Sequence, residues 1–368
     1  MTTVAILGNS NRNLGAVCAG DMALAGHAVR YAPFNPAPGE LEVLKVRGGF
    51  DLQGDPEGYF CGRTGVGTLE AVCRTTKEAL KGAEVVLIDV PMPELESRFS
   101  AMLSDLPRGV VVHVLSHGYW PAARLTPLLR RAGREDVLVT EAVAPTHIAT
   151  RDGIVVRGTR RRGLEISTVP GRRTDEALTK LRPLFSDLSS APSVLQTGLE
   201  SLNLMVHPAM TLLGIGLLER AELNGLDKIR FYGECNVPSS GRLADELDAE
   251  RGRVCSAYGV RHRVLAEALD QYYGTSGQGA YEAVQNCAAY KSLAYSVSMW
   301  RSWQPVDVPY GIVPVVRLAE QAGIAAPLHR ATAEIFGALL GFSPWSTSPT
   351  LESMALDGEP EAVIRRVS

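Results

Sequence analysis

The chain opens on a strand, a glycine-containing loop and a helix, and this opening constrains the fold more than any other stretch. Residues 3–7 are β-branched or apolar and end at Gly8, small and apolar residues at helical spacing run from 15 to 25, and residues 27–31 have the pattern of a second strand. Strand, helix and parallel strand in this order form the first unit of a nucleotide-binding sheet. We therefore expect an α/β fold that starts with a Rossmann-type unit.

Later apolar runs extend this sheet. Three of them have the length of buried strands, at residues 84–90, 110–115 and 137–141. Because helical or loop connections separate them, the expected fold is a doubly wound parallel sheet. Residues 153–156 and 164–168 are expected to form a β-hairpin, with the arginine run 160–162 in its solvated turn, and residues 175–185 a closing helix.

The chain of 368 residues is long enough for about two domains. Serine, alanine and proline cluster at residues 189–192, and almost every segment beyond them has helical periodicity. We therefore expect an NAD(P)-binding Rossmann-type domain in residues 1–190 and a mainly α-helical second domain in residues 191–368.

Composition narrows the class of protein. A net charge of -3 with 21% charged residues argues against a nucleic-acid binder. The six cysteines show no metal-ligand spacing, which predicts reduced thiols and no metal site. The N-terminus has no export signal, and the most apolar segment is interrupted by His207, Pro208 and Glu219. These features predict a cytoplasmic protein that binds neither nucleic acid nor membrane.

The loop between the first strand and the first helix is the candidate phosphate site. It lacks a strict Gly-x-Gly-x-x-Gly pattern, but it lies where backbone N–H groups and a helix N-terminus hold phosphates. Arg12 is expected to reach a phosphate and Asn13 to cap the helix, with an asparagine-rich turn without a ligand as the alternative. The candidate residues are Gly8, Asn9, Ser10, Asn11, Arg12, Asn13 and Gly15.

The end of the second strand bears on the choice between NAD and NADP. An acidic residue there would bind the adenosine ribose hydroxyls, and none occurs before Glu40. Arg30 and Asn35 are the candidate cofactor residues in this stretch. Their pattern favours NADP over NAD, although Arg30 can instead lie within the strand.

One long apolar segment, residues 197–221, carries two polar exceptions. Asn203 and His207 are four residues apart, so a helix places the amide and the imidazole on one side. A buried polar group needs a partner whatever its purpose. His207 is therefore either a satisfied core histidine or a functional group.

Several separated motifs in the helical half resemble those of the opine dehydrogenase family, the octopine and nopaline dehydrogenase type. The resemblance covers most of residues 197–340 and extends weakly to the nucleotide-binding half. The motifs that carry it are Asn203-Leu-Met-Val-His-Pro208, Phe231-Tyr-Gly-Glu-Cys-Asn-Val-Pro-Ser-Ser-Gly, Asp248-Ala-Glu-Arg251, Tyr281-Glu-Ala-Val284, Ala289-Tyr-Lys291 and Asp307-Val-Pro-Tyr-Gly-Ile-Val-Pro314.

The resemblance implies that residues 191–368 are the substrate and catalytic domain, and it also implies individual site residues. The family's motif histidine, a proton donor or acceptor, falls on His207, and the aspartate that pairs with it falls on Asp307. An arginine that binds a substrate carboxylate falls near Arg301, where the spacing to Asp307 is one residue longer than in the family; the alternative is a surface arginine. Asn203 is expected to orient the substrate or the nicotinamide amide, or only to bridge helices.

Two further histidines follow strands at the sheet edge where α/β proteins bind ligands. His117 comes after the fourth predicted strand and His147 after the fifth. Each is a candidate to border the nicotinamide or the substrate, and the alternative for each is a polar surface residue, which is the common role of loop histidines.

The resemblance implies an NAD(P)H-dependent oxidoreductase that condenses an amino acid with a 2-oxo acid through an imine, and that also runs the reverse oxidation. The expected partners are these small molecules, with homodimerisation left open. One alternative is a ketopantoate-reductase-like or β-hydroxyacid dehydrogenase, although those families use a Lys-x-x-x-Asn helix where this chain has Asn-x-x-x-His. The other is a cofactor-binding regulator without catalysis.

Overall fold

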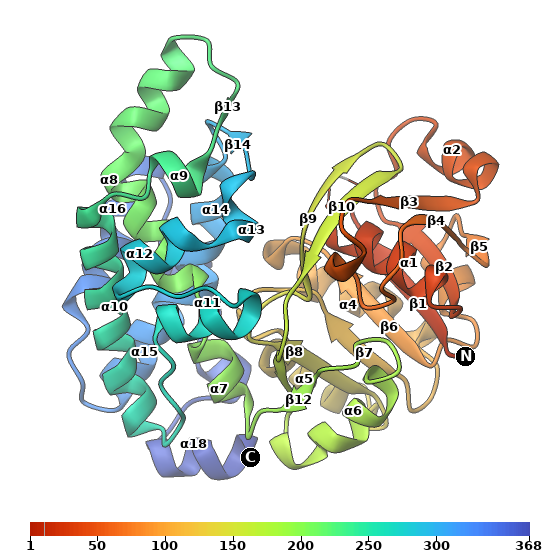
Figure 1. Ribbon diagram of the computed structural model, residues 1–368. Helices are drawn as coiled ribbons and strands as arrows, with labels where there is room; N and C mark the ends of the chain where they lie inside the picture. The colour runs from red at the N-terminus through yellow and green to blue at the C-terminus, as the bar shows by residue number, and fades with distance from the viewer. Residues whose placement is uncertain (11) are drawn as a thin grey trace. The chain divides into compact units, whose positions relative to one another are not determined.

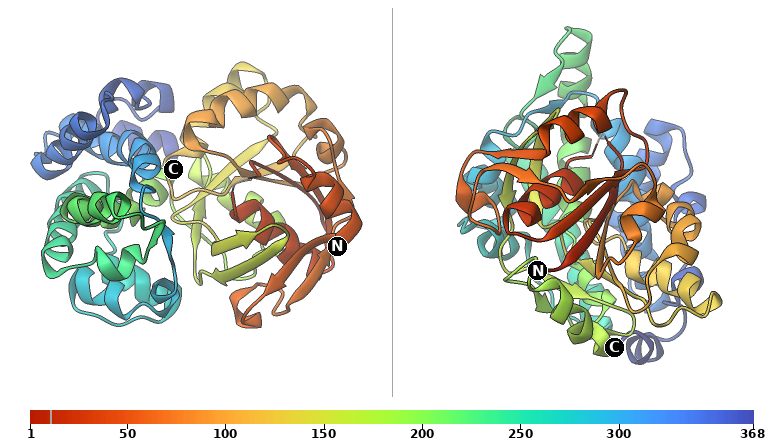
Figure 2. Two further views of the ribbon diagram at one scale, coloured as in Figure 1. Left: turned by 90° about the horizontal axis from the view of Figure 1, so that it is seen from above. Right: turned by 90° about the vertical axis from the view of Figure 1, so that its right-hand side faces the viewer.

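The computed structural model describes residues 1–10 and 12–368, so the predicted cofactor residue Asn11 lies outside the described residues. The chain divides into two compact units. One comprises Met1–Ser116, Pro121–Val194 and Ser368, and the other comprises His117–Trp120 and Leu195–Val367. Strands and helices alternate in the first unit, whereas the second is almost wholly helical (Figures 1 and 2).

The first unit is built on an eight-stranded sheet with the order β12-β11-β8-β7-β6-β1-β2-β5. Neighbouring strands from β5 to β8 are parallel, and β1 lies between β2 and β6. Because the chain changes direction across the sheet at β1, a ligand site is expected at the carboxyl end of this strand. The predicted α/β class is confirmed. The strands are β1 (Thr3–Gly8), β2 (Ala28–Pro33), β5 (Ala71–Val72), β6 (Val85–Asp89), β7 (Val111–Val114), β8 (Leu138–Ala142), β11 (Glu165–Ser167) and β12 (Ser189–Ser190).

Burial explains why these runs form a parallel sheet. All residues of β6, β7 and β8 are buried, so both faces of the strands are covered and their sequences are mostly apolar, without a regular alternation of apolar and polar residues. The principal helices of this unit are α1 (Leu14–Leu24), α2 (Glu40–Arg47), α3 (Thr76–Leu80), α4 (Leu95–Met102), α5 (Pro121–Arg131) and α6 (Thr174–Leu181).

A second sheet of four strands packs against α1, and the sequence analysis missed it. Its order is β4-β3-β10-β9, with β4 (Gly65–Thr68), β3 (Gly49–Gln53), β10 (Val155–Arg160) and β9 (His147–Asp152). The hairpin of this sheet turns at Gly153 and Ile154, between the paired residues Asp152 and Val155, and Gly153 has a φ of 57°. A glycine at the first position of a two-residue turn is a hairpin signal because this position can require positive φ. The predicted pairing of residues 153–156 with 164–168 is therefore wrong.

The arginine run also lies elsewhere than predicted. Arg160 ends β10, and Arg161 is 6% exposed and donates hydrogen bonds to the carbonyl oxygens of Pro145 and His147. The following strand β11 joins the main sheet, antiparallel to β8. The run thus connects two sheets and is not a hairpin turn. Arg161 is buried in this connection, where the backbone carbonyls at the start of β9 need donors, whereas Arg162 is exposed.

The second unit is mainly α-helical, as expected from the sequence. One core cluster joins the consecutive elements η5 and α15 to α16 through Val308, Ile312, Val313, Val316, Ala333 and Phe336. The larger helices are α7 (Val194–Leu199), α8 (Asn203–Leu223), α10 (Pro238–Ala257), α11 (Leu265–Tyr273), α12 (Gly279–Asn286), α14 (Trp300–Asp307), α15 (Val313–Gln321), α16 (Pro327–Leu340) and α18 (Pro360–Val367), with the π-helical turn η5 (Val308–Ile312) after α14.

The apolar segment expected as one helix is divided. Helix α7 ends at Leu199 and α8 begins at Asn203. The carbonyl of Leu199 accepts a hydrogen bond of 2.8 Å from the buried guanidinium of Arg251, which also pairs with Asp248. A side chain therefore caps α7 where a continuous helix would have used a backbone amide.

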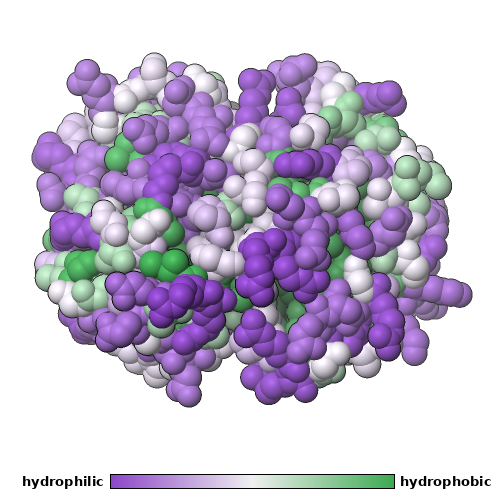
Figure 3. All heavy atoms as spheres, turned by 90° about the horizontal axis from the view of Figure 1, so that it is seen from below, coloured by the Kyte–Doolittle hydropathy of each residue, from purple (hydrophilic) through white to green (hydrophobic). Residues whose placement is uncertain are grey.

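Val194–Leu223 is long and apolar enough to cross a membrane by length and composition, but 67% of its most apolar window is buried inside the protein. Core helices of soluble proteins pass the same test. Figure 3 shows one face of the molecule, where hydrophilic residues predominate and hydrophobic residues occur in small groups.

We predict that His113 makes the stability of the first unit dependent on pH. This histidine of β7 is buried, its Nδ1 lies 2.9 Å from Thr140 Oγ1, and burial lowers its pKa from 6.5 to about 4. Because the folded pKa is depressed, the neutral ring stabilises the fold fully above pH 6.5, and this contribution is lost as pH falls toward 4. The shift corresponds to on the order of 3 kcal/mol.

Denaturant unfolding at several pH values between 7 and 4 measures this contribution. His113→Gln, which keeps a polar group near Thr140 but does not titrate in this range, is expected to have a shallower decline of unfolding free energy than the unaltered chain. Equal declines in the two proteins would contradict the assignment.

Candidate active site

A histidine and an aspartate form the centre of the site in the helical unit. His207 Nδ1 lies 2.8 Å from Asp307 Oδ2, and their side chains are 8% and 5% exposed. His207 comes from α8, and Asp307 is the last residue of α14. The structure therefore brings together the two residues that the sequence assigned to catalysis, which are a hundred positions apart.

The π-helical turn after α14 positions the aspartate. Val308 and Ile312 of this turn are fully buried in the core of the unit. Single π-helical turns are uncommon and occur often at functional sites. Core packing immediately after Asp307 thus fixes the backbone that carries the carboxylate.

Tyr119 extends the pair on the aspartate side. Its hydroxyl donates to Asp307 Oδ1 and accepts a hydrogen bond of 3.2 Å from Asn203 Nδ2. Each Asp307 oxygen thus has one donor, which satisfies a buried carboxylate. The structure connects Asn203 to His207 through Tyr119 and Asp307, so the two polar residues of α8 belong to one network.

Sequence reasoning missed Tyr119, although it lies two residues after the candidate His117. Gly118, Tyr119 and Trp120 have φ values of 76°, 65° and 63°. A left-handed conformation is strained for bulky residues and often marks a functional segment. This strain can be seen only in the backbone conformation, because nothing in the letters of the Ser-His-Gly-Tyr-Trp motif indicates it.

Aromatic side chains enclose the other edge of the imidazole. His207 Nε2 lies 2.8 Å from the Tyr232 hydroxyl, and the Trp303 ring stacks on the imidazole with centroids 4.6 Å apart at 21°. Tyr232 stacks in turn on Tyr290, at 4.2 Å and 15°. The sequence analysis had not singled out any of these three aromatic residues as site residues.

These contacts define which nitrogen carries the mobile proton. A carboxylate only accepts, so His207 Nδ1–H donates to Asp307. In the neutral ring Nε2 then accepts from the Tyr232 hydroxyl, and in the imidazolium it donates. Nε2, on the side of Tyr232, is therefore the ring nitrogen that can exchange a proton.

Arg301 does not lie where the resemblance placed it. Its guanidinium contacts Glu222 at 2.6 Å and Glu219 at 3.6 Å, lies over the Trp300 ring, and is 41% exposed. The two carboxylates of α8 already neutralise it on the exposed side of α14. The expectation that Arg301 binds a substrate carboxylate is therefore corrected. Arg301 forms a surface ion pair, which is the alternative considered from the sequence.

The two candidate loop histidines have different environments. His117 is half-buried, with its ring centroid 6.2 Å from that of Tyr119, so its substrate role stays a prediction. His147 is in β9 with a fully buried side chain, and its Nε2 lies 3.3 Å from the Asp21 carboxylate. A substrate cannot reach His147, and its predicted role is wrong because the ring fills the interior between α1 and the second sheet.

In the first unit, the donors expected to hold phosphate contact Asp89 at the end of β6. The Gly15 amide donates to Asp89 Oδ2 at 2.7 Å, and Arg12 Nε donates to Asp89 Oδ1. The Asn13 amide donates to the Ala149 carbonyl and does not cap α1. The expectation that Arg12 and Gly15 bind phosphate is therefore corrected, because both groups donate their hydrogen bonds to the Asp89 carboxylate.

The rest of the loop borders the neighbouring strands. Gly8 is the last residue of β1, and the nearly buried Asn9 donates from Nδ2 to Glu94 Oε1 at 3.5 Å. The backbone carbonyl of Ser10 accepts from Arg151 at 2.9 Å. Backbone and side chains of the loop are thus fixed at the carboxyl edge of β1, where the sheet order reverses.

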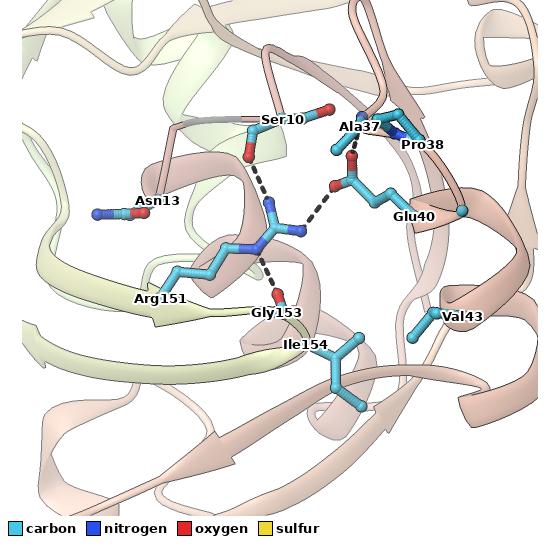
Figure 4. A pocket seen from close by; sticks show the side chains of 10 residues that line it. Ser10, Asn13, Ala37, Pro38, Glu40, Val43, Arg151, Gly153 and Ile154 are labelled. Atoms are coloured by element: carbon cyan, nitrogen blue, oxygen red, sulfur yellow. Dashed lines mark hydrogen bonds and ion pairs between the residues drawn. The ribbon is translucent and has the colours of Figure 1, made fainter.

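A cavity of about 400 Å³ opens beside this loop (Figure 4). It is lined by Ser10 and Asn13, by residues 37–40 after β2, and by Arg151. Figure 4 shows Arg151 reaching the Ser10 and Gly153 carbonyls and the Glu40 carboxylate, the last at 2.6 Å. Its place at the carboxyl edge and its mixed charges fit the ribose end of a dinucleotide cofactor.

Glu40 is a charged wall of this cavity. Burial acts to raise the pKa of its carboxyl, but donors that face it, including Arg151, more than compensate and hold the pKa below its usual value. The side chains of both residues are 9% exposed. The cavity therefore contains a carboxylate and a guanidinium that neutralise each other.

The two residues expected to favour NADP lie beside this region. Arg30 is within β2 and bonds to Glu70 at 2.7 Å and to the Lys81 carbonyl, so its expected cofactor role is wrong. With its amide oxygen facing Arg98, Asn35 accepts a hydrogen bond of 3.1 Å. Asn35 follows the carboxyl end of β2, and its role stays a prediction.

The family comparison matches the helical half of the chain. Residues 190–340 match the model described as NAD/NADP octopine/nopaline dehydrogenase, alpha-helical domain. An opine dehydrogenase of Arthrobacter sp. (strain 1C) is 27% identical over 289 residues, which cover 78% of this chain and 79% of that protein. The resemblance inferred from the motifs is confirmed.

Solved structures show the same fold. An octopine dehydrogenase structure with NADH and L-arginine has a TM-score of 0.70 at 17% identity, covering 99% of this chain and 98% of its own. A yersinopine dehydrogenase with NADP+ bound has a TM-score of 0.68 at 14% identity, covering 100% and 98%. At these identities the likeness concerns the fold, and the site rests on the geometry described above.

We predict that Asp307 fixes the tautomer of His207. Nitrogen-15 NMR of the histidine rings is expected to show His207 protonated at Nδ1 when neutral. In Asp307→Asn the amide can donate or accept, so both tautomers are expected. Glu222→Gln, which alters the Arg301 pair on the same helix, serves as the control and should leave the signal unchanged. A neutral His207 protonated at Nε2 in the unaltered chain would contradict the prediction.

Proposed function

We propose that this chain, of the opine dehydrogenase type in residues 190–340, joins an amino acid to a 2-oxo acid by reductive condensation and also runs the reverse oxidation. The chain is an NAD(P)-dependent oxidoreductase. The observation that carries the proposal is the buried 2.8 Å contact between His207 and Asp307 in the domain that matches the family.

The chemistry needs proton transfer at the reacting nitrogen and oxygen. The amine must lose a proton before its nitrogen attacks the carbonyl carbon, and the hydroxyl of the adduct must gain a proton to leave as water. When bound, the nicotinamide supplies the hydride that reduces the imine carbon. His207 accepts the first proton at Nε2 and donates the second, while Asp307 stabilises the imidazolium.

The surrounding residues orient this exchange. Trp303 stacks on the imidazole, and Tyr119 holds the second oxygen of Asp307, so neither ring nor carboxylate rotates freely. Tyr232 contacts the nitrogen that exchanges the proton. The substrate nitrogen or oxygen therefore exchanges its proton with His207 Nε2 either directly beside the Tyr232 hydroxyl or by way of this hydroxyl.

The alternatives account for less of the structure. A carbonyl reductase of the ketopantoate-reductase or β-hydroxyacid dehydrogenase type relies on a lysine and an asparagine on one helix, whereas α8 carries Asn203 and His207. A cofactor-binding regulator without catalysis would leave the satisfied network of four polar side chains around His207 without a purpose. Both are outcomes of the test below.

We propose that the enzyme prefers NADP(H) to NAD(H). The segment between β2 and Glu40 has no carboxylate, and Arg151 lines the cavity beside it. Arg151 can form a bidentate pair with the 2′-phosphate once Glu40 releases it. Glu40 would instead accept hydrogen bonds from the ribose hydroxyls of NAD(H), so the balance between these two side chains decides the preference.

We further propose that the enzyme works in the cytoplasm and that its partners are small-molecule substrates, without nucleic acid or membrane. Its six cysteines, all among the described residues, are free thiols. Free thiols are typical of a reducing compartment. Homodimerisation remains part of the proposal and is tested by the mass of the purified protein in solution.

The first test is a screen of amino acids paired with 2-oxo acids in the presence of NADH or NADPH, with product mass measured. We expect cofactor oxidation that requires both substrates and a product whose mass equals their sum minus one oxygen atom. His207→Gln is expected to reduce kcat/KM about 10²- to 10⁴-fold, the usual contribution of acid–base catalysis. Arg301→Gln, the control, should change it less than about threefold.

Turnover that ignores every amine would favour the carbonyl reductase. Cofactor binding without turnover across the whole panel, unchanged in His207→Gln, would favour the regulator. Either result contradicts the proposed condensation.

We predict that Arg151 discriminates between the two cofactors. Arg151→Gln should raise the KM for NADPH about tenfold or more with little change for NADH, because a charge-assisted phosphate contact contributes about 1.5–3 kcal/mol. Glu40→Gln should lower the KM for NADPH relative to NADH, because it removes a carboxylate from the cavity. Arg157→Gln, an arginine of the same hairpin that contacts Gln53, is the control. Equal effects of Arg151→Gln on both cofactors would contradict the assignment.

A further inference from the structure

A second cavity, of about 290 Å³, lies in the helical unit. The stacked rings of Tyr232 and Tyr290 contribute to its wall, and Arg230, Gln285 and Lys291 also line it. Its size approaches the lower end of small-molecule sites, about 300 Å³. This cavity has no role in the reaction steps proposed above.

The cavity is directly linked to the catalytic pair. Tyr232 lines the cavity, and its hydroxyl lies 2.8 Å from His207 Nε2. This is the nitrogen that the Asp307 contact leaves for proton exchange. A molecule bound in the cavity is therefore separated from the catalytic histidine by a single tyrosine side chain.

The lining residues give the cavity a positive charge. Arg230 and Lys291 are cationic, and no lining residue is acidic. Arg230 Nε is 3.6 Å from Glu234, a contact with a 65% exposed arginine that is weak in water. Within residues 1–10 and 12–368, no ion pair of Lys291 occurs. Two cations thus face a space next to the acid–base centre in a chain whose net charge is -3.

The positive charge of this cavity can provide the carboxylate-binding group that Arg301 does not provide. Both proposed substrates carry a carboxylate, which needs a cation where it is removed from water. Arg301 is already paired with Glu222 and Glu219 on the exposed side of α14. Arg230 and Lys291 line a cavity that also touches Tyr232, so they meet the requirement that Arg301 does not.

We propose that Arg230 and Lys291 bind the carboxylate of a condensing substrate in this cavity. The inference rests on the proposed function and names the residues that recognise the acid. Arg230 supplies a planar pair of donors and Lys291 a compact charge, while the tyrosine stack supplies a flat wall along the carbon chain. The carboxylate so held directs the adjacent reacting nitrogen or carbonyl oxygen toward Tyr232 and His207 Nε2.

The carboxylate can belong to the amino acid or to the 2-oxo acid, and the experiment distinguishes these sources. Arg230→Gln, Lys291→Gln and the double variant are assayed with the substrates found in the screen, each as the acid and as its amide. We expect the double variant to raise KM about 10- to 100-fold for one of the two acids, as expected for lost charge-assisted contacts, with kcat within about threefold. The KM for the matching amide should not change.

Arg301→Gln is the matched control, because it removes a cation of the same unit outside the cavity. An equal effect of the double variant on acid and amide, or no effect on either acid, overturns the inference even if turnover is normal. Circular dichroism checks that the variants are folded, and the single variants report separately if the double variant is not.

Calorimetry separates this inference from the proposed reaction. The unaltered chain with NADPH is titrated with pyruvate against pyruvamide and with L-arginine against agmatine, pairs that differ in a carboxylate. We expect tighter binding of one acid, and loss of that difference in the double variant. This result would support the anion site even if the screen found no condensation, and the absence of any preference for an acid would overturn it.

Discussion

The contact between His207 and Asp307 is the constraint on which the helical unit depends. Two ionisable side chains are buried there, and burial of an unpaired charge is costly, so α8 and α14 must keep the ring and the carboxylate within hydrogen-bond distance. Tyr119 and Tyr232 satisfy the outer atoms of the pair. The network therefore determines how three chain segments pack as well as where a proton can move.

Packing holds the network from behind. Asp307 is followed by the π-helical turn whose Val308 and Ile312 belong to a buried apolar cluster of the unit. A shift of the carboxylate would thus require the core to repack, which costs more than the small rotations that a solvated aspartate makes freely. The position of Tyr119 is fixed differently, by a strained left-handed backbone. Tyr119 lies in the short segment His117–Trp120, which belongs to the second unit although the chain before and after it belongs to the first. Rigid support of this kind is what an acid–base pair needs to keep its geometry during the reaction.

The parts that sequence alone predicted are those with a local or periodic signal. The parallel strands were found because strands such as β6 are apolar up to their last residue, and His207 stood out because it interrupts an apolar helix. The second sheet was missed because β3 and β4 are short and contain three glycines, and the pairing of β3 with β10 is nonlocal. The pairing of His207 with Asp307 came from family resemblance, since spacing cannot show that residues a hundred positions apart meet.

Arginine residues show most clearly what sequence cannot decide. Arg12, Arg30 and Arg301 were chosen for anionic ligands, and the structure pairs them with Asp89, Glu70 and Glu222. A guanidinium is always charged, so its availability depends on whether the fold places a carboxylate beside it. Because those carboxylates lie on other elements of the fold, motif reading cannot distinguish a structural arginine from a binding one. Cavities add the missing information: Arg151, although paired with Glu40, lines a cavity beside the loop after β1, and Arg230 lines one beside Tyr232.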